Sequence, residues 1–144
     1  MKFKHGTRRR AAEYEKDWVQ RWKEDDTFNK SIAQRPADNS WVFYDGPPFL
    51  TGTPHHGHLL VSTVKDTMGR FHTMKGQRVE RRWGWDCHGL PAEVYVEKTL
   101  GISNKKEIGT KISVSDYVKE CRAAMVRTGT EWEDTIERIG RWVE

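Results

Sequence analysis

The chain has 144 residues, of which 35% are hydrophobic and 32% are charged, and its formal net charge is +4. A length of this order allows one domain with a hydrophobic core, whereas a mean hydropathy of −0.87 and the lack of any run of ~20 apolar residues exclude a membrane-spanning segment. The N-terminus lacks the apolar core of a signal peptide and two cysteines are too few for a disulfide framework, so we expect a cytoplasmic protein.

The first forty residues are predicted to form a helix and a linker. An apolar stripe at helical spacing predicts a helix from about Arg8 to Asp26, with Thr7 as a candidate N-cap. The stripe, which we expect to lie in the core, consists of Ala11, Tyr14, Trp18 and Trp22. The segment from Phe28 to Ser40 contains proline, aspartate, asparagine and serine, which predicts an irregular link into the next element.

A strand, a loop and a helix are predicted next. Trp41 to Tyr44 is a short run of aromatic and β-branched residues, which is typical of a buried strand. Apolar residues at helical spacing predict a helix from about Gly57 to Met74 that ends near Gly76. A second strand and its exit are predicted within Gln77 to Trp85. Strand, helix and strand at this spacing make one crossover unit of a parallel sheet.

Two further helices are predicted in the last third of the chain. Leu90 to Leu100 reads as a helix that ends at Gly101, and Ser103 to Thr110 reads as a lysine-rich loop. From about Ser113 onward, residues three or four apart predict a long helix with one apolar seam. The seam consists of Tyr117, Cys121, Met125, Thr128, Trp132, Ile136, Ile139 and Val143. Gly129 weakens this helix by about 1 kcal/mol relative to alanine, so we expect packing to compensate.

The most informative segment runs from Asp45 to His58 and reads D-G-P-P-F-L-T-G-T-P-H-H-G-H. A helix start offers an anion free backbone N–H groups and the positive end of a dipole. His55 and His58 at this start could donate hydrogen bonds to phosphate oxygens, and Gly57 would let the backbone approach a nucleotide. On H-x-G-H alone, a polyphosphate site and a surface or metal-binding histidine cluster are equally good interpretations.

A second segment, G-W-D-C-H-G-L-P from Gly84 to Pro91, changes that balance. Taken with the loop before it, this sequence closely resembles the catalytic domain of the class I aminoacyl-tRNA synthetases, and within them the isoleucine-specific branch. The resemblance covers most of the chain from Trp41 onward and includes V-E-K-T-L-G-I and E-R-I-G-R-W-V. It implies an α/β fold that is helix-rich, with an N-terminal helix and linker in residues 1–40. Residues 41–144 would form the first half of a Rossmann-like parallel-sheet nucleotide-binding domain with a long C-terminal helix, truncated before the editing insertion and the second signature loop.

The resemblance implies that His55 and His58 are catalytic and contact the phosphates of ATP. The ATP-binding set implied in this way is Thr51, His55, Gly57 and His58. The family's reaction would be ATP-dependent activation of L-isoleucine to isoleucyl-adenylate, with Mg²⁺ present, followed by transfer to tRNA(Ile). The complete enzyme is expected to be a monomer, and no tightly bound metal is expected in this segment.

For the amino acid and the adenylate, the resemblance implies a pocket lined by the backbone of Gly46 and Pro47. Asp86 would bind the α-ammonium group of the amino acid, which suits a carboxylate at the C-terminal end of a strand. In isolation, Asp86 could equally be a solvated acid at a strand end.

The chain departs from the family pattern in three ways. His56 stands where an apolar or aromatic residue is usual, Thr51 stands where some members have asparagine, and the second signature, K-M-S-K-S, is absent from the sequence. Lys105-Lys106 does not match that pattern. Two alternatives therefore stay open. One is a non-catalytic fragment that binds ATP or adenylate, and the other is a small stand-alone H-x-G-H nucleotidyltransferase, whose motif would lie nearer the chain start.

Other polar residues have simpler interpretations. Cys87 and His88 could bind a metal, but their spacing to the remaining cysteine and histidines is not that of a zinc site. Arg81-Arg82 could assist phosphate binding or lie on an exposed strand edge. The run of three arginines from Arg8 is expected to be a solvated helix start, with contact to tRNA as the alternative.

Overall fold

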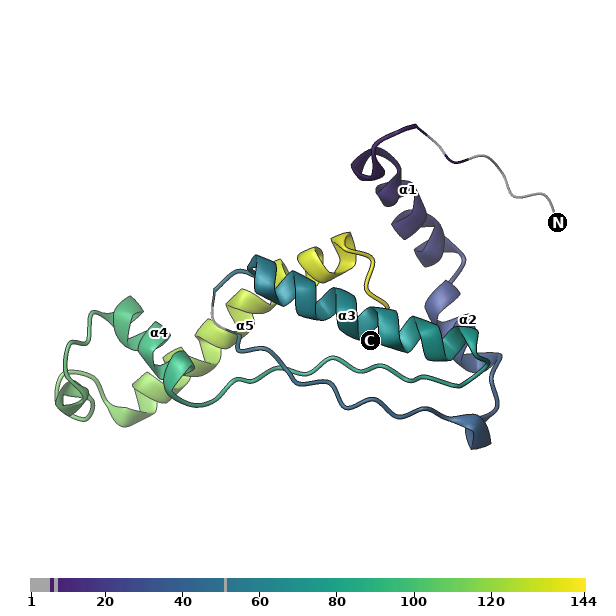
Figure 1. Ribbon diagram of the computed structural model, residues 1–144. Coiled ribbons are helices and arrows are strands. Elements are labelled where there is room, and N and C mark those ends of the chain that lie inside the picture. Colours follow the sequence, from purple (N-terminus) through teal and green to yellow (C-terminus); the bar gives the residue numbers. More distant parts are fainter. Residues whose placement is uncertain (1–5, 7, 51) are drawn as a thin grey trace.

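The computed structural model of the protein describes residues 6, 8–50 and 52–144, and the side chains of residues 127, 128 and 130 are not among those described. These residues contain five α helices and two short 3₁₀ helices (Figure 1). The elements are α1 (Ala11–Glu24), α2 (Thr27–Ala33), η1 (Ala37–Asn39), α3 (His56–Met74), α4 (Leu90–Leu100), η2 (Lys105–Glu107) and α5 (Val114–Arg138). No helix in the described ranges is long and apolar enough to cross a membrane.

The predicted helices over α1, α3, α4 and α5 are confirmed. The irregular link predicted from Phe28 to Ser40 is wrong, because the chain forms α2 and η1 there. Asp26 separates α1 from α2 with a left-handed backbone (φ 48°), a conformation that aspartate tolerates better than most residues. The predicted N-cap Thr7 lies outside the described residues.

The predicted parallel strands appear as two extended segments, residues 40–50 and 78–86, that run side by side (Figure 1). Parallel bridges join them only at their two ends, between Ser40 and Arg78 and between Phe49 and Asp86. Nine residue steps separate the bridges on the first segment and eight on the second, so the register shifts between them. Pro47 and Pro48 also lack the N–H that a ladder needs. Among the described residues there is consequently no continuous strand, and the parallel sheet is not formed as predicted.

The expected burial of Trp41 to Tyr44 holds on one face only. Trp41 stacks on the imidazole of His72 of α3, with ring centroids 3.8 Å apart, and Phe43 stacks on Trp41 at 5.5 Å. The alternate residues Val42 and Tyr44 are 69% and 93% exposed. Because successive side chains of an extended segment point to opposite faces, α3 covers one face and leaves the other open.

A third extended segment joins these two at residues 141–144. The Glu144 N–H donates to the Arg81 carbonyl at 3.0 Å, and the Trp83 N–H donates to the Glu144 carbonyl at 2.7 Å. This bonding is that of parallel neighbours. The segment 78–86 therefore lies between the other two.

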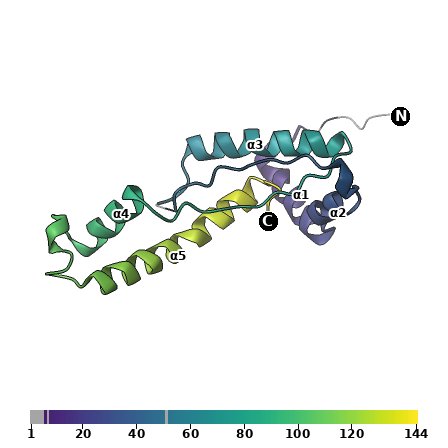
Figure 2. The same ribbon diagram turned by 90° about the horizontal axis from the view of Figure 1, so that it is seen from below.

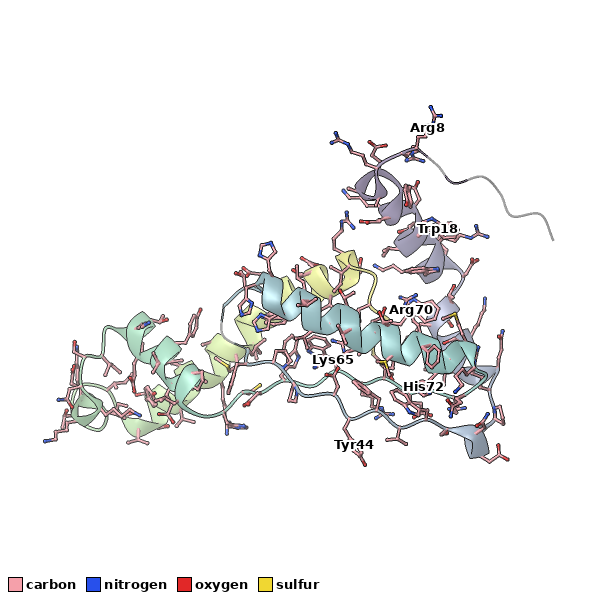
Figure 3. All side chains as sticks on the ribbon, in the orientation of Figure 1. Arg8, Trp18, Tyr44, Lys65, Arg70 and His72 are labelled. Carbon is pink, nitrogen blue, oxygen red and sulfur yellow. The ribbon has the colours of Figure 1, made fainter. Side chains whose placement is uncertain are left out.

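The hydrophobic core lies mainly between α4 and α5, which run alongside each other and extend away from α1 and α2 (Figure 2). The buried cluster consists of Leu50, Ala92, Val96, Ile102, Tyr117, Ala124, Met125 and Trp132. The predicted seam is confirmed at its buried members Tyr117, Met125, Trp132 and Ile136. It is wrong at Ile139, which is 39% exposed, and at Val143, which lies in an extended segment after the end of α5. The side chain of Thr128 lies outside those described. The predicted core stripe of α1 is wrong at Trp18, which is 47% exposed (Figure 3), and α1 has no buried residue.

The face of α3 that turns inward is polar. Its buried residues are Ser62, Gly69 and Thr73, whereas its large apolar side chains, from Leu60 to Met74, are exposed. A charged group lies beneath this face. Arg81 is 8% exposed, donates to the Thr73 hydroxyl at 2.8 Å and lies 4.0 Å from Asp66. The exposed-edge interpretation is therefore wrong for Arg81.

Burial lowers the pKa of Arg81 to about 10, although the nearby Asp66 carboxylate acts in the opposite direction. The guanidinium thus stays charged at neutral pH. Arg70 bonds Asp66 at 2.6 Å and lies over the ring of Trp142, 3.9 Å from its centroid. The small residues of α3 make room for this arginine layer.

Replacing Gly69 by alanine is expected to lower the free energy of unfolding by about 1–3 kcal/mol, the usual cost of overpacking. A Cβ at this position would lie 2.4 Å from Nε of Arg81, whose guanidinium is held by Thr73 and Asp66. Urea denaturation of both proteins, followed by circular dichroism, measures the difference.

Gly129→Ala is the matched control, because Gly129 also lies inside a helix but a Cβ there meets no described atom within 4 Å. Among the described side chains, none packs where a Cβ of Gly129 would lie, so they do not provide the packing that we expected at this glycine. This variant should gain about 0.5–1 kcal/mol from helix propensity. Equal changes in the two variants would contradict the steric role of Gly69.

Candidate functional site

The two signature histidines lie together at the start of α3. His55 is the N-cap residue, and its Nδ1 accepts a hydrogen bond from the Gly57 N–H at 3.1 Å. In return, Nδ1 of His58 accepts from the His55 N–H at 3.2 Å, which completes a capping box. The two imidazole rings stack with centroids 3.7 Å apart. The sequence prediction that His55 and His58 meet at a helix start is confirmed.

Gly57 has a local reason for lacking a side chain. A Cβ on Gly57 would lie 3.0 Å from Cε1 and 3.1 Å from Nδ1 of His55. The glycine thus lets the His55 ring fold back over the first turn of the helix. Its predicted approach to a nucleotide stays a prediction. His56, between them, is exposed, and Thr51 lies outside the described residues.

Trp132 of α5 contacts the start of α3 and the loop before it. Its indole N–H donates to the carbonyl of Gly52 at 2.9 Å, and its ring centroid lies 4.7 Å from that of His58. Only 1% of Trp132 is exposed. The sequence placed Trp132 in the apolar seam of a helix, and nothing in its spacing indicated a contact with the histidine loop. Burial of an indole whose N–H needs an acceptor was the available signal.

The pKa of His58 is lowered from 6.5, first because partial burial disfavours the imidazolium and second because of charge on His55. The neutral ring also suits the capping box, in which Nδ1 of His58 must accept a hydrogen bond. At neutral pH, His58 is therefore expected to be uncharged with Nε2 as its N–H donor.

We expect the His58 imidazole to titrate below pH 6.5 in the folded chain, which an NMR titration measures. Because the unfolded state binds the proton more tightly, the stability due to this shift is present above pH 6.5. It is lost as the pH falls through the lowered pKa. His58→Gln should therefore lose less unfolding free energy between pH 7 and pH 5 than the parent chain does. A His58 pKa at or above 6.5 would contradict this.

Charged side chains hold the backbone around Gly46 and Pro47, within the first extended segment. The carboxylate of Asp45 forms ion pairs with Lys65 of α3 and with Arg141. Lys65 also donates to the Gly46 carbonyl at 3.0 Å, and it lies between α3 and the extended segment (Figure 3). The side chains of Asp45 and Arg141 are only 13% and 5% exposed, so these contacts are shielded from water. Gly46 and Pro47 themselves are exposed.

Asp86 lies where the two extended segments pair at their ends. Its N–H donates to the Pro48 carbonyl at 2.9 Å, and its own carbonyl accepts from the Leu50 N–H at 3.1 Å. One carboxylate oxygen accepts from the His88 N–H at 3.3 Å. Within the described part of the chain, this half-buried carboxylate forms no ion pair. The structure thus brings Asp86 next to the residues that follow Pro47, and among the described residues no hydrogen bond or ion pair joins its carboxylate to His55 or His58.

The open question of a metal site concerns Cys87 and His88. The described residues include no group of three or more histidine, cysteine, aspartate or glutamate side chains placed to hold a metal ion. Cys87 and Cys121 are both free thiols.

Comparison with known proteins identifies the family of this chain. The sequence pattern of the family described as "tRNA synthetases class I (I, L, M and V)" matches residues 17–144. Among curated proteins, an isoleucine–tRNA ligase of Treponema denticola is 47% identical over 92% of this chain and 12% of its own length. The corresponding ligase of Wolbachia pipientis wMel is 48% identical over 90% of this chain and 12% of its own length.

The likeness extends to eukaryotes. The cytoplasmic isoleucine–tRNA ligase of Caenorhabditis elegans is 47% identical over 88% of this chain and 11% of its own length. The chain thus spans about an eighth of the length of the curated relatives it matches. Since the family match covers more than half of these residues, the chain belongs to the class I tRNA synthetases of the I, L, M and V group.

Proposed function

We propose that this chain is the part of an isoleucine–tRNA ligase that holds ATP and the amino acid during formation of isoleucyl-adenylate. The observation that carries the proposal is an identity of 47–48% to isoleucine–tRNA ligases over about nine-tenths of the chain. The complete polypeptide would then transfer isoleucine to tRNA(Ile), and we expect it to act as a monomer in the cytoplasm.

In this proposal His55 and His58 bind the phosphates of ATP at the start of α3. The capping box uses Nδ1 of each ring as an acceptor, which leaves Nε2 of each ring as the donor available to a phosphate oxygen. The dipole of α3 favours an anion at the same place. Thr51 and Gly57 would complete this ATP-binding set, and Mg²⁺ would enter with ATP as part of the substrate.

Asp86 would bind the α-ammonium group of isoleucine, and the backbone of Gly46 and Pro47 would line the pocket for the amino acid and the adenylate. Two observations support this placement. The Asp86 carboxylate has no cationic partner among the described side chains, and its backbone is paired with the residues that follow Pro47. Catalysis would come from positioning the carboxylate of isoleucine against the α-phosphorus and from stabilising the developing charge.

The proposed fold is the first half of a Rossmann-like domain in residues 41–144, with a helical extension in residues 1–40. The order of the three extended segments supports it, because residues 78–86 lie between residues 141–144 and 40–50. In one half of a doubly wound fold, the first three strands lie in the order third, second, first, counted from the edge of the sheet. The segments 141–144, 78–86 and 40–50 have that order.

The chain alone is expected to bind without turnover. The sequence has no K-M-S-K-S loop for the leaving pyrophosphate, and it spans about an eighth of the length of its relatives. The non-catalytic, ATP-binding alternative is thus our proposal for the isolated chain. The family match over residues 17–144 favours a synthetase over a stand-alone nucleotidyltransferase.

Isoleucine-dependent exchange of pyrophosphate into ATP tests the proposal. A complete polypeptide containing this chain should exchange with isoleucine far faster than with leucine or valine. The 144-residue chain should show negligible exchange under the same conditions. Faster exchange with another amino acid would contradict isoleucine as the substrate. Exchange by the 144-residue chain at the rate of the complete polypeptide would contradict the proposal that this chain binds without turnover.

A further inference from the structure

We infer that Trp132 is a positioning residue that fixes the histidine loop, residues 52–58, onto α5. The inference deepens the proposed function and rests on it, because the loop matters for ATP only if His55 and His58 hold its phosphates. Trp132 itself would touch no substrate. It acts through the backbone of Gly52 and through the ring of His58.

Trp132 makes two contacts with the loop, one at each end. Its indole N–H bonds the carbonyl of Gly52, 80 residues away in the chain, at 2.9 Å. Its ring packs against His58 with centroids 4.7 Å apart, and His58 in turn stacks on His55 at 3.7 Å. One rigid side chain therefore links the entry of the loop to both imidazoles.

The position of Trp132 is itself fixed. The residue is 1% exposed, and its ring packs against Trp85 and Trp83 with centroids 5.8 and 6.2 Å apart. Tryptophan has only two side-chain torsions, so a buried ring held by other aromatic rings keeps one orientation. The packed core around α5 therefore holds the Trp132 side chain, and with it the point at which the loop is attached.

The loop needs such an anchor. Gly52 has a positive φ of 78°, a region that glycine enters without steric cost, and a Cβ there would meet no described atom within 4 Å. His55 and His58 are tied to each other and to the first turn of α3, but those bonds do not fix the loop relative to the rest of the site. A misplacement of about 1 Å in a group that orients a substrate can cost about 100-fold in rate.

A neighbouring indole provides a matched control. Nε1 of Trp83 is buried and has no hydrogen-bond partner among the described residues, and Trp83 makes no ring contact with His58. Trp83→Phe therefore removes an indole N–H from the same aromatic cluster without removing a bond. Trp132→Phe removes the bond to Gly52 and keeps an aromatic ring.

Both variants are made in the 144-residue chain and compared by amide hydrogen exchange and by NMR titration of His58. Loss of one net hydrogen bond should speed exchange in residues 52–58 about threefold to tenfold in Trp132→Phe, and exchange in α4 should change less. The His58 pKa should move toward 6.5 as the ring becomes more hydrated. Trp83→Phe removes part of the packing around Trp132 but keeps its bond to Gly52, so both readouts should change less in Trp83→Phe than in Trp132→Phe.

Equal loop exchange and equal His58 titration in the two variants would overturn the inference, whatever their melting temperatures. Affinity for Mg·ATP is measured in parallel and should fall about threefold to tenfold in Trp132→Phe and less in Trp83→Phe. If the parent chain itself fails to bind Mg·ATP, the proposed function fails. The exchange and titration data still decide the role of Trp132, because they need no nucleotide.

If Trp132→Phe does not fold, the parent chain supplies the test. The indole N–H of Trp132 should exchange far more slowly than that of Trp18, which is 47% exposed, and its ring should show nuclear Overhauser contacts to His58. Absence of those contacts would overturn the inference.

Discussion

Mg·ATP is expected to bind the 144-residue chain weakly, and the double substitution His55→Ala with His58→Ala is expected to abolish that binding. Hydrogen bonds to charged groups contribute about 1.5–3 kcal/mol each, so two lost donors correspond to roughly a hundredfold to ten-thousandfold in affinity. Isothermal titration calorimetry of the parent chain and the double variant measures the effect. Unchanged affinity in the double variant would refute a role for these imidazoles.

Both rings also cap α3, so the alanine substitutions remove the cap as well as the proposed phosphate donors. A second variant distinguishes these two effects. Removing an N-cap side chain costs about 1 kcal/mol. The double variant His55→Asn with His58→Gln keeps oxygen acceptors at the N-cap and at the third helical position, where asparagine and glutamine are favoured. It should keep the helix content of the parent chain and bind ATP with an affinity between those of the parent and the alanine variant, because each side-chain amide keeps an N–H donor. Full parental affinity in this variant would show that the imidazoles themselves are not required.

His56→Ala is the control within the motif itself. His56 lies between the two stacked rings in the sequence, yet it is exposed and its side chain takes no part in the capping box. We expect its replacement to leave ATP affinity within about twofold of the parent chain. A large loss would mean that the loop binds phosphate through a surface different from the one the capping box leaves open.

The sequence predicts the helices well because their signals are local. Leu90–Leu100 has Pro91 near its start and Gly101, with φ 65°, at its end, and the observed α4 has those bounds. The long helix predicted from about Ser113 is α5, and Ser113 is its N-cap. In contrast, α2 lacks a side-chain cap and has only seven residues, so no local signal distinguishes it from a link.

The orientation of α3 shows where local patterns fail. A pattern of apolar residues predicts a helix, but it does not say which face turns inward. Here the buried face carries Gly69 and Thr73, because Arg81 occupies the space beneath it. Burial of an arginine depends on partners from distant segments, such as Asp66 and Thr73, and these are not visible in the local sequence.

The candidate site also combines contacts that are local in sequence, which could be predicted, with contacts between residues far apart in the chain, which could not. His55, Gly57 and His58 are close in sequence, and the capping box that joins them follows from their spacing. Trp132 and Arg141 reach the same loops from 80 and 96 residues away. The local sequence predicts only that Trp132 belongs to the apolar seam of a helix and that Arg141 follows that helix. Contacts at such separations depend on the packing of α5 against the extended segments, which single-sequence periodicity does not encode.

Replacing Asp86 by asparagine in a complete polypeptide that contains this chain should abolish isoleucine-dependent exchange of pyrophosphate into ATP. Asparagine keeps the carbonyl oxygen that accepts the His88 N–H, so the local turn should survive. What the variant loses is the negative charge proposed to pair with the α-ammonium group. Removing one member of a shielded charge pair costs about 2–5 kcal/mol, which corresponds to roughly 30- to 4,000-fold in kcat/KM for isoleucine.

The effect should fall on isoleucine and leave ATP alone. Calorimetry should give the Asp86→Asn variant an affinity for Mg·ATP close to that of the parent, because His55 and His58 are unchanged. Asp38→Asn, which removes an exposed carboxylate from η1, is the charge-matched control and should exchange normally. Near-normal exchange by Asp86→Asn would refute the proposed ammonium site. Without the carboxylate, the ammonium group of isoleucine would be unpaired in a shielded pocket, and its carboxylate would not be held in place for attack on the α-phosphorus.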